Sequence, residues 1–187
     1  MNNIFVIGVG LIGGSLCLDI KKIYPKVKVY GIDTSSENLD LALKLDLIDY
    51  KSSLDVLYKA DLVLISTPVD VANNIIIDVL NNINCTSLVI DFGSTKTNIC
   101  STVENHKIRK NYLASHPIAG TEFSGPNAAF LGLFNKIYCF FSGIIDIPST
   151  VTKSSKLIIK PNLEHFFPFI LTFPFVIRLS ACLREQY

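Results

Sequence analysis

Short apolar runs alternate with longer mixed stretches along the first 116 residues. The apolar runs predict strands at 2–7, 27–32, 61–66, 88–91 and 112–115. The run at 61–66 is continuous, as in a parallel strand that is buried on both faces. The mixed stretches predict helices directly after the first strand and at 35–45, 52–60, 71–82 and 95–106. This alternation predicts an α/β fold with a doubly wound parallel sheet.

The alternation fails after about residue 140. Residues 142–160 are rich in Ser, Thr and Ile without a clear period, and residues 166–177 are almost entirely apolar. The apolar stretch has twelve residues and two prolines, whereas a membrane-spanning helix needs about 20 apolar residues. We therefore interpret it as a core segment or as sequence that has lost its fold. The prediction is one domain over 1–141 and a divergent or truncated, irregular tail over 142–187.

Composition narrows the class of protein. The 187 residues carry a net charge of +1, and 49% are hydrophobic, so a sizeable core is expected. The absence of a basic block argues against nucleic-acid partners and against an acidic membrane surface. Five scattered cysteines without a CxxC pair predict a reducing compartment and no metal site. Because Met1 leads straight into the first strand, we expect a cytoplasmic protein without a signal peptide.

A glycine motif links the first strand to the first helix. It reads Gly8-Val9-Gly10-Leu11-Ile12-Gly13, and the second strand then ends at an acid. Strand, glycine loop, helix, strand and acid in this order are the fingerprint of a Rossmann-type dinucleotide-binding domain. The first glycine allows the tight turn, the second lets the backbone approach a pyrophosphate, and the third lets the helix pack on the strand. The predicted cofactor-binding residues in this loop are Gly8, Gly10, Leu11, Ile12 and Gly13.

The acid is Asp33, and it predicts NAD rather than NADP as the cofactor. A carboxylate at this place accepts hydrogen bonds from the ribose hydroxyls and would repel a 2′-phosphate. Residues 34–36 supply no arginine that could hold such a phosphate. The alternative is that Asp33 caps the helix that follows it.

Three polar loops follow later strands, and ligands of open α/β sheets bind outside the carboxyl ends of strands. The first loop contains Ser66, Thr67 and Pro68, which we predict to bind the cofactor. The second loop covers residues 91–96, and the third covers residues 115–126. Both place small or polar residues beside the expected nicotinamide.

The second and third loops hold the candidate catalytic residues. His116 is the candidate acid–base group, because the pKa of histidine suits proton transfer near neutrality. Ser94 is a candidate for orienting the imidazole or the substrate, or alternatively the N-cap of the next helix. Glu122 is a candidate for binding substrate, gating the site or tuning His116, or alternatively a solvated carboxylate. Lys96 stands in the first turn of a predicted helix, where a cation hints at an anionic partner.

Together these motifs resemble the prephenate dehydrogenase family of tyrosine biosynthesis. The resemblance covers roughly residues 1–140 and rests on the glycine loop and on LISTPV, DFGSTK and HPIAGTE, which begin at residues 64, 91 and 116. It implies a small-molecule substrate, prephenate, that NAD⁺ oxidises with loss of carbon dioxide to 4-hydroxyphenylpyruvate. It also implies that His116 takes the hydroxyl proton, that Ser94 helps to hold His116, and that Glu122 lies at the mouth of the site.

The last part of the chain departs from the family pattern. Family members continue into a helical domain that forms a homodimer and supplies an arginine for the substrate carboxylates, and residues 142–187 match neither feature. We therefore expect poor dimerisation. Three alternatives stay open: a catalytically impaired NAD-binding remnant, an arogenate dehydrogenase, and a different NAD-dependent dehydrogenase such as a 3-hydroxy acid enzyme.

Overall fold

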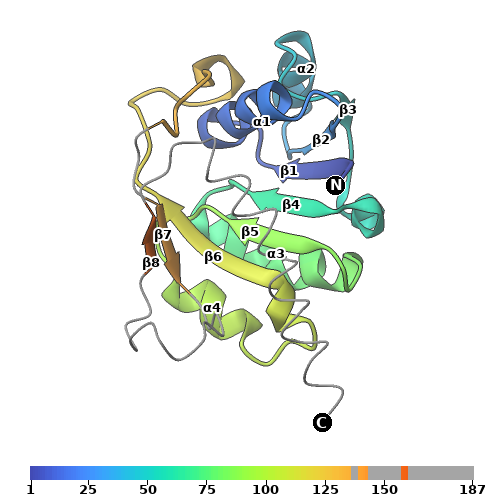
Figure 1. Cartoon of the computed structure of the whole chain (residues 1–187), viewed down its shortest axis with the longest axis vertical. Coiled ribbons are helices and arrows are strands. Elements are labelled where there is room, and N and C mark those ends of the chain that lie inside the picture. Colours follow the sequence, from blue (N-terminus) through green and yellow to red (C-terminus); the bar gives the residue numbers. More distant parts are fainter. Residues whose placement is uncertain (136–138, 143–156, 160–187) are drawn as a thin grey trace.

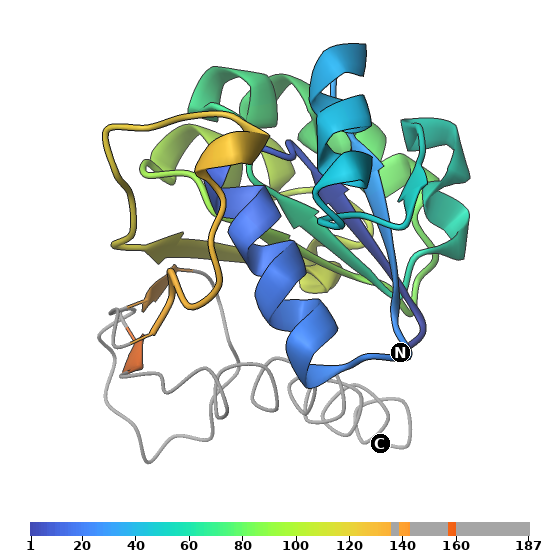
Figure 2. The same cartoon turned by 90° about the horizontal axis from the view of Figure 1, so that it is seen from above.

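The computed structural model describes residues 1–135, 139–142 and 157–159, so the apolar stretch at 166–177 lies outside the described residues. Helices cover both faces of one sheet (Figures 1 and 2). The strands are β1 (Asn3–Ile7), β2 (Lys28–Ile32), β3 (Tyr50–Lys51), β4 (Leu62–Ile65), β5 (Leu88–Asp91), β6 (Tyr112–Pro117), β7 (Cys139–Ser142) and β8 (Leu157–Ile159). The α-helices are α1 (Leu11–Ile23), α2 (Ser36–Lys44), α3 (Val69–Asn82) and α4 (Thr97–Val103). Short 3₁₀ helices are η1 (Leu54–Lys59), η2 (Arg109–Asn111) and η3 (Pro126–Ala128).

The order of the strands is β3-β2-β1-β4-β5-β6-β7-β8. Pairing is parallel from β3 to β6, which confirms the predicted doubly wound parallel sheet. The sequence pattern does not predict β3, β7 and β8. The two residues of β3 are both exposed and too few to form a hydrophobic pattern. Strands β7 and β8 extend the sheet by antiparallel pairing, and β8 lies beyond the predicted domain boundary at residue 141.

Alternate residues of each central strand enter two different cores. In β1, Ile4 and Val6 join the core beneath α1 and α2, whereas Phe5 and Ile7 join the core beneath α3 and α4. All four side chains are at most 4% exposed. Because successive side chains of a strand point to opposite faces, an apolar residue at every position means burial on both faces.

Two predicted helices differ from the observed ones. The stretch 52–60 forms the 3₁₀ helix η1, and the helix predicted over 95–106 is shorter, because α4 occupies only Thr97–Val103. Its carboxyl end tightens into i→i+3 bonds, in which the Glu104 N–H donates to Ser101 and the His106 N–H to Val103. Among the helices of the described residues, none is long and apolar enough to cross a membrane.

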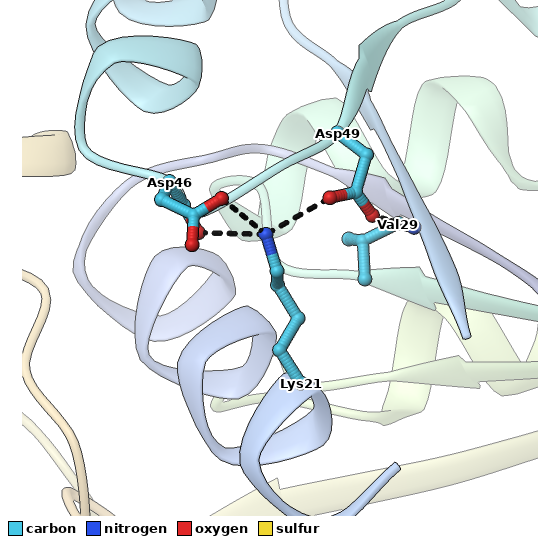
Figure 3. A network of polar contacts seen from close by, with 4 residues as sticks. All are labelled: Lys21, Val29, Asp46 and Asp49. Carbon is cyan, nitrogen blue, oxygen red and sulfur yellow. Dashed lines mark hydrogen bonds and ion pairs between the residues drawn. The ribbon is translucent and has the colours of Figure 1, made fainter. Parts of the chain in front are cut away.

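A polar network ties α1 and the end of α2 to β2 (Figure 3). The ammonium of Lys21 donates to the Asp46 carboxylate at 2.6 Å and to the Asp49 carboxylate at 2.9 Å, and Asp49 also accepts the Val29 N–H at 2.7 Å. Partial burial by itself lowers the pKa of Lys21, but the bonds to Asp46 and Asp49 raise it above its ordinary value. The network joins the last turn of α1 to β2 and to the segment after α2, and its two carboxylates favour the charged form of Lys21.

Candidate active site

The glycine loop lies where the order of the sheet reverses, between β1 and β4. Gly8 has a φ of +88°, in the left-handed region that favours glycine, and its N–H donates to the Ile32 carbonyl at 2.8 Å. A Cβ on Gly13 would lie 1.9 Å from the Gly8 carbonyl oxygen. The turn therefore requires Gly8, and the close contact between α1 and the loop requires Gly13.

Gly10 has a different environment. A Cβ there would meet no protein atom closer than the Gly125 nitrogen, at 3.9 Å. Packing within the described residues therefore does not require a glycine at this position, whereas the close approach of a pyrophosphate would. Leu11 and Ile12 form the first turn of α1, where backbone N–H groups have no partner within the helix and are available to an anion, and their side chains pack against the core beneath α1.

Asp33 lies directly after β2 and is held against the glycine loop. Its carboxylate accepts the Val9 N–H at 3.1 Å and the Ser35 N–H at 2.9 Å. The alternative that Asp33 caps α2 is wrong, because Ser35 is the N-cap and its side chain accepts the Asn38 N–H at 3.2 Å. The carboxylate is therefore fixed where the adenosine ribose of a dinucleotide is expected.

The loop after β4 lies beside the glycine loop. The Ser66 hydroxyl donates to the Gly8 carbonyl at 2.7 Å, so this side chain holds the loop in place. The Thr67 methyl group lies 3.1 Å from the place of a Cβ on Gly8, and its hydroxyl is buried without a hydrogen-bond partner in the described part of the chain. Pro68 is the N-cap of α3. All three residues lie at the predicted edge of the sheet.

His116 is half-buried near the carboxyl end of β6, next to the end of β5. The neighbouring Ser115 hydroxyl donates to the Asp91 carbonyl at 2.8 Å and joins the two strand ends. Burial lowers the pKa of His116, the charge of Lys96 lowers it further, and the Asp91 carboxylate opposes this effect. The imidazole is therefore neutral near pH 7, as a proton acceptor must be.

The other two predicted catalytic residues are exposed. Ser94 lies on the loop between β5 and α4, and Glu122 lies on the segment that follows β6. The alternative that Ser94 caps the next helix is wrong, because Lys96 takes the N-cap position of α4. The structure thus places both side chains in the two loops that carry His116 and Lys96, and leaves both open to solvent.

Asp91, to which the sequence motifs assign no role, is 1% exposed and lies at the centre of a charged cluster. Its carboxylate accepts the ammonium of Lys96, the N–H of Gly93 at 3.0 Å and the hydroxyl of Tyr112. Burial raises the pKa of Tyr112, and the nearby Asp91 carboxylate raises it further. The signal in the sequence was an acid that ends an apolar strand with a lysine five residues later. The cation that hinted at an anionic partner has a partner within the chain.

A second missed feature is the segment at 118–135, which runs from the end of β6 to α1 (Figures 1 and 2). Two α1 side chains hold it: Ser15 accepts the Phe130 N–H at 3.1 Å, and Asp19 accepts the Gly132 N–H at 2.8 Å. Leu133 and Phe134 are buried in the core beneath α1. These contacts hold the segment against α1, and the Gly125 nitrogen lies 3.9 Å from the place of a Cβ on Gly10. No local pattern indicates the two hydrogen bonds, because their partners are more than 110 residues apart.

The fold and the glycine loop define a nucleotide-binding α/β domain, with an imidazole on the same edge of the sheet. Residues 16–140 match the family model described as the nucleotide-binding domain of prephenate dehydrogenase. The chain belongs to the prephenate dehydrogenase family.

Curated relatives share about a third of their residues with this chain. Prephenate dehydrogenase of Bacillus subtilis is 31% identical over 169 residues, which are 88% of this chain and 46% of the relative. Cyclohexadienyl dehydrogenase of Zymomonas mobilis is 34% identical over 71% of this chain and 46% of its own length. The chain therefore spans about half the length of the curated relatives it matches.

Solved structures share the fold. Prephenate dehydrogenase of Aquifex aeolicus, in complex with hydroxyphenyl propionate and NAD⁺, has a TM-score of 0.72 and 26% identity over 95% of this chain and 57% of that chain. Arogenate dehydrogenase of Synechocystis has a TM-score of 0.70 and 24% identity over 78% of this chain and 52% of that chain, a likeness of fold alone.

Proposed function

We propose that this chain binds NAD⁺ at the glycine loop and carries the catalytic histidine of a prephenate dehydrogenase. The observation that carries the proposal is the place of His116, a neutral imidazole on the edge of the sheet that holds Gly8 and Asp33. Membership of the prephenate dehydrogenase family supports the same reaction.

The residues of the loop fit this cofactor. The open side of Gly10 leaves room for the pyrophosphate, the first turn of α1 offers N–H groups to it, and Asp33 offers a carboxylate to the ribose. The same carboxylate would repel the additional phosphate of NADP⁺. Thr67 adds a buried hydroxyl that has no hydrogen-bond partner within the described residues.

The reaction needs a proton acceptor next to the hydroxyl of the substrate ring. NAD⁺, when bound, accepts a hydride from the carbon that bears this hydroxyl. His116 takes the hydroxyl proton as the carbon–oxygen double bond forms. The bond to the ring carboxylate then breaks, carbon dioxide leaves, and the electron pair enters the ring, which becomes aromatic. The ring oxygen takes the proton back from His116 and becomes the phenol hydroxyl of the product. We assign Ser94 to orienting His116 or the substrate, and Glu122 to the mouth of the site.

Arogenate is the second candidate substrate. The match to a relative named cyclohexadienyl dehydrogenase favours testing it, because prephenate and arogenate both contain the same cyclohexadiene ring. The two differ only in a keto or amino group on the side chain, away from the proton that His116 would take. The proposed chemistry is therefore the same for both.

The first experiment measures NAD⁺ binding by calorimetry and NADH formation by absorbance with prephenate and with arogenate. His116→Asn should lower kcat by about 10²–10⁴, the contribution of a general base, and leave the Kd for NAD⁺ nearly unchanged. His106→Asn is the matched control, because that side chain lies near Asn81 at 3.2 Å, away from the edge. As the pH is lowered, kcat should fall with a midpoint below the ordinary pKa of histidine.

Three outcomes would contradict parts of the proposal. Full activity of His116→Asn would remove the assigned catalytic role. Binding of NAD⁺ without turnover of either substrate would favour the catalytically impaired remnant. Failure to bind NAD⁺ would overturn the proposal as a whole.

A further inference from the structure

The register of β5 and β6 puts Asp91 and His116 on one face of the sheet. Asp91 pairs with Ala114, and side chains of paired residues in parallel strands point to the same face. Tyr112, Ala114 and His116 alternate along β6 and therefore share that face with Asp91. The bond between the Tyr112 hydroxyl and the Asp91 carboxylate agrees with this arrangement.

Asp91 in turn fixes the position of a positive charge. Lys96 is bound to the Asp91 carboxylate, and their side chains are only 14% and 1% exposed. Gly93 and Tyr112 donate to the same carboxylate and hold it in place from two other sides. A long lysine side chain normally samples many rotamers, but here the buried anion restricts its ammonium to one place.

We propose that Asp91 and Lys96 form a positioning pair for His116, in which buried Asp91 fixes the ammonium of Lys96 so that its charge acts on the imidazole. This inference rests on the proposed function, since it gives Lys96 a part in the proton transfer to His116. Neither residue is proposed to touch the substrate.

The balance of charges around His116 gives the direction of the effect. The charge of Lys96 lowers the pKa of His116 and the Asp91 carboxylate raises it, and the effect of the lysine is the larger of the two. The positive end of the pair therefore dominates at the imidazole and favours its neutral form. A neutral imidazole can accept a proton, whereas an imidazolium cannot. The pair thus extends the activity of His116 toward lower pH.

The test is an NMR titration of the histidine side chains in the full chain, with the His116 signal assigned by its loss in His116→Asn. The double variant Lys96→Met/Asp91→Asn replaces the pair by neutral groups and avoids a buried unpaired charge, which would be strongly destabilising. The titration midpoint of the His116 imidazole should move to higher pH in this variant. In Lys96→Arg, which keeps the charge, it should stay at the wild-type value.

A matched control removes a lysine from another ion pair. Lys51 binds Asp40 on the surface, and Lys51→Met should leave the His116 midpoint unchanged. A second measurement needs no variant of the pair, because coupling between two titrating groups is mutual. The side-chain signal of Lys96 in the wild-type chain should inflect at the midpoint of His116, and this inflection should vanish in His116→Asn.

The outcomes separate this inference from the proposed function. An unchanged or lowered His116 midpoint in the folded double variant would overturn the positioning role. So would the same upward shift in Lys96→Arg, or a Lys96 signal without the inflection. None of these measurements uses turnover, so they test the pair even if the chain fails to oxidise prephenate. That failure would refute the proposed reaction only. If turnover is found, the acid limb of kcat/KM should move upward with the double variant.

Discussion

The two halves of the ligand-binding edge are built in different ways. Around β1, the loop is formed by backbone: Gly8 and Gly13 allow contacts that side chains would block, and Ser66 holds the turn. Around β5 and β6, the edge is formed by charged side chains that are buried together, with Asp91 at their centre.

Because of this difference, steric effects and electrostatic effects can be tested in separate parts of the site. Added atoms at the β1 end collide with backbone, so most changes there should reduce stability. Charge-altering changes at the β5 and β6 end should modify proton transfer while the sheet persists. Substitutions in the glycine loop should therefore act mainly through steric overlap, whereas substitutions around His116 should act mainly through charge. The following predictions test this contrast, from the largest expected effect to the smallest.

The largest effect is expected from Gly13→Ala. The new Cβ would overlap the Gly8 carbonyl oxygen, which belongs to the backbone and cannot rotate away. We expect a loss of about 3 kcal/mol in the free energy of unfolding, measured by urea denaturation. Gly120→Ala is the control, because a Cβ there meets nothing within 4 Å, and it should stay within about 0.5 kcal/mol of wild type. Equal stability of the two variants would contradict the close contact between α1 and the loop.

Gly10→Ala should separate binding from folding. The methyl group has space in the chain, so stability should fall by no more than about 1 kcal/mol, the cost of a poor N-cap. It would occupy the space assigned to the pyrophosphate, and the Kd for NAD⁺ should rise by about 10- to 100-fold, or about 1.4–2.8 kcal/mol. Calorimetric titration measures the Kd. An unchanged Kd would place the cofactor elsewhere.

Asp33→Asn should narrow the preference for NAD⁺ over NADP⁺ by about 1–2 kcal/mol. The substitution removes the charge that attracts the ribose hydroxyls and repels the extra phosphate. Parallel titrations with both cofactors measure the difference. Ser35→Ala is the matched control, since it removes the cap of α2 and should lower stability by about 1 kcal/mol without changing the preference. Wild-type binding of NADP⁺ as tight as that of NAD⁺ would refute the assignment.

Asp19→Asn should have the smallest effect, and the effect should depend on pH. Burial raises the pKa of Asp19, and one of its carboxylate oxygens has no hydrogen-bond partner in the described part of the chain. The folded state therefore binds the proton more tightly than the unfolded state, so the stability from this group is present at low pH. This stabilisation is lost as the pH rises from about 4, the pKa of an aspartate in the unfolded chain, through the higher pKa of Asp19 in the folded state. Asparagine cannot ionise, and its bond to Gly132 can persist.

Urea denaturation at several pH values measures this difference. The stability of wild type relative to Asp19→Asn should decline as the pH rises through that window. Asp40→Asn is the control for removal of an exposed carboxylate, and it should change stability by at most about 1 kcal/mol. A difference that stays constant with pH would show that Asp19 ionises equally easily in the folded and unfolded states.

The amino-acid sequence alone predicts five of the six parallel strands, the glycine loop and the place of Asp33 after β2, whereas the short strand β3 is not predicted. These features depend on neighbours along the chain: apolar runs form buried strands, and Gly8-x-Gly10-x-x-Gly13 joins a strand to a helix within six residues. The lengths of α4 and η1 were less predictable, because the last bonds of a short helix depend on its packing.

Which polar groups meet depends on the tertiary structure. Asp91 and Tyr112 are 21 residues apart, and Ser15 and Phe130 are 115 residues apart, so no local pattern records either contact. The strand register brings the first pair together, and the return of residues 118–135 to α1 brings the second. A buried charge is stable only when it is paired, and the fold decides which groups are close enough to pair with it. The charged surroundings of His116 therefore follow from the packing of the sheet and not from the motif that contains His116.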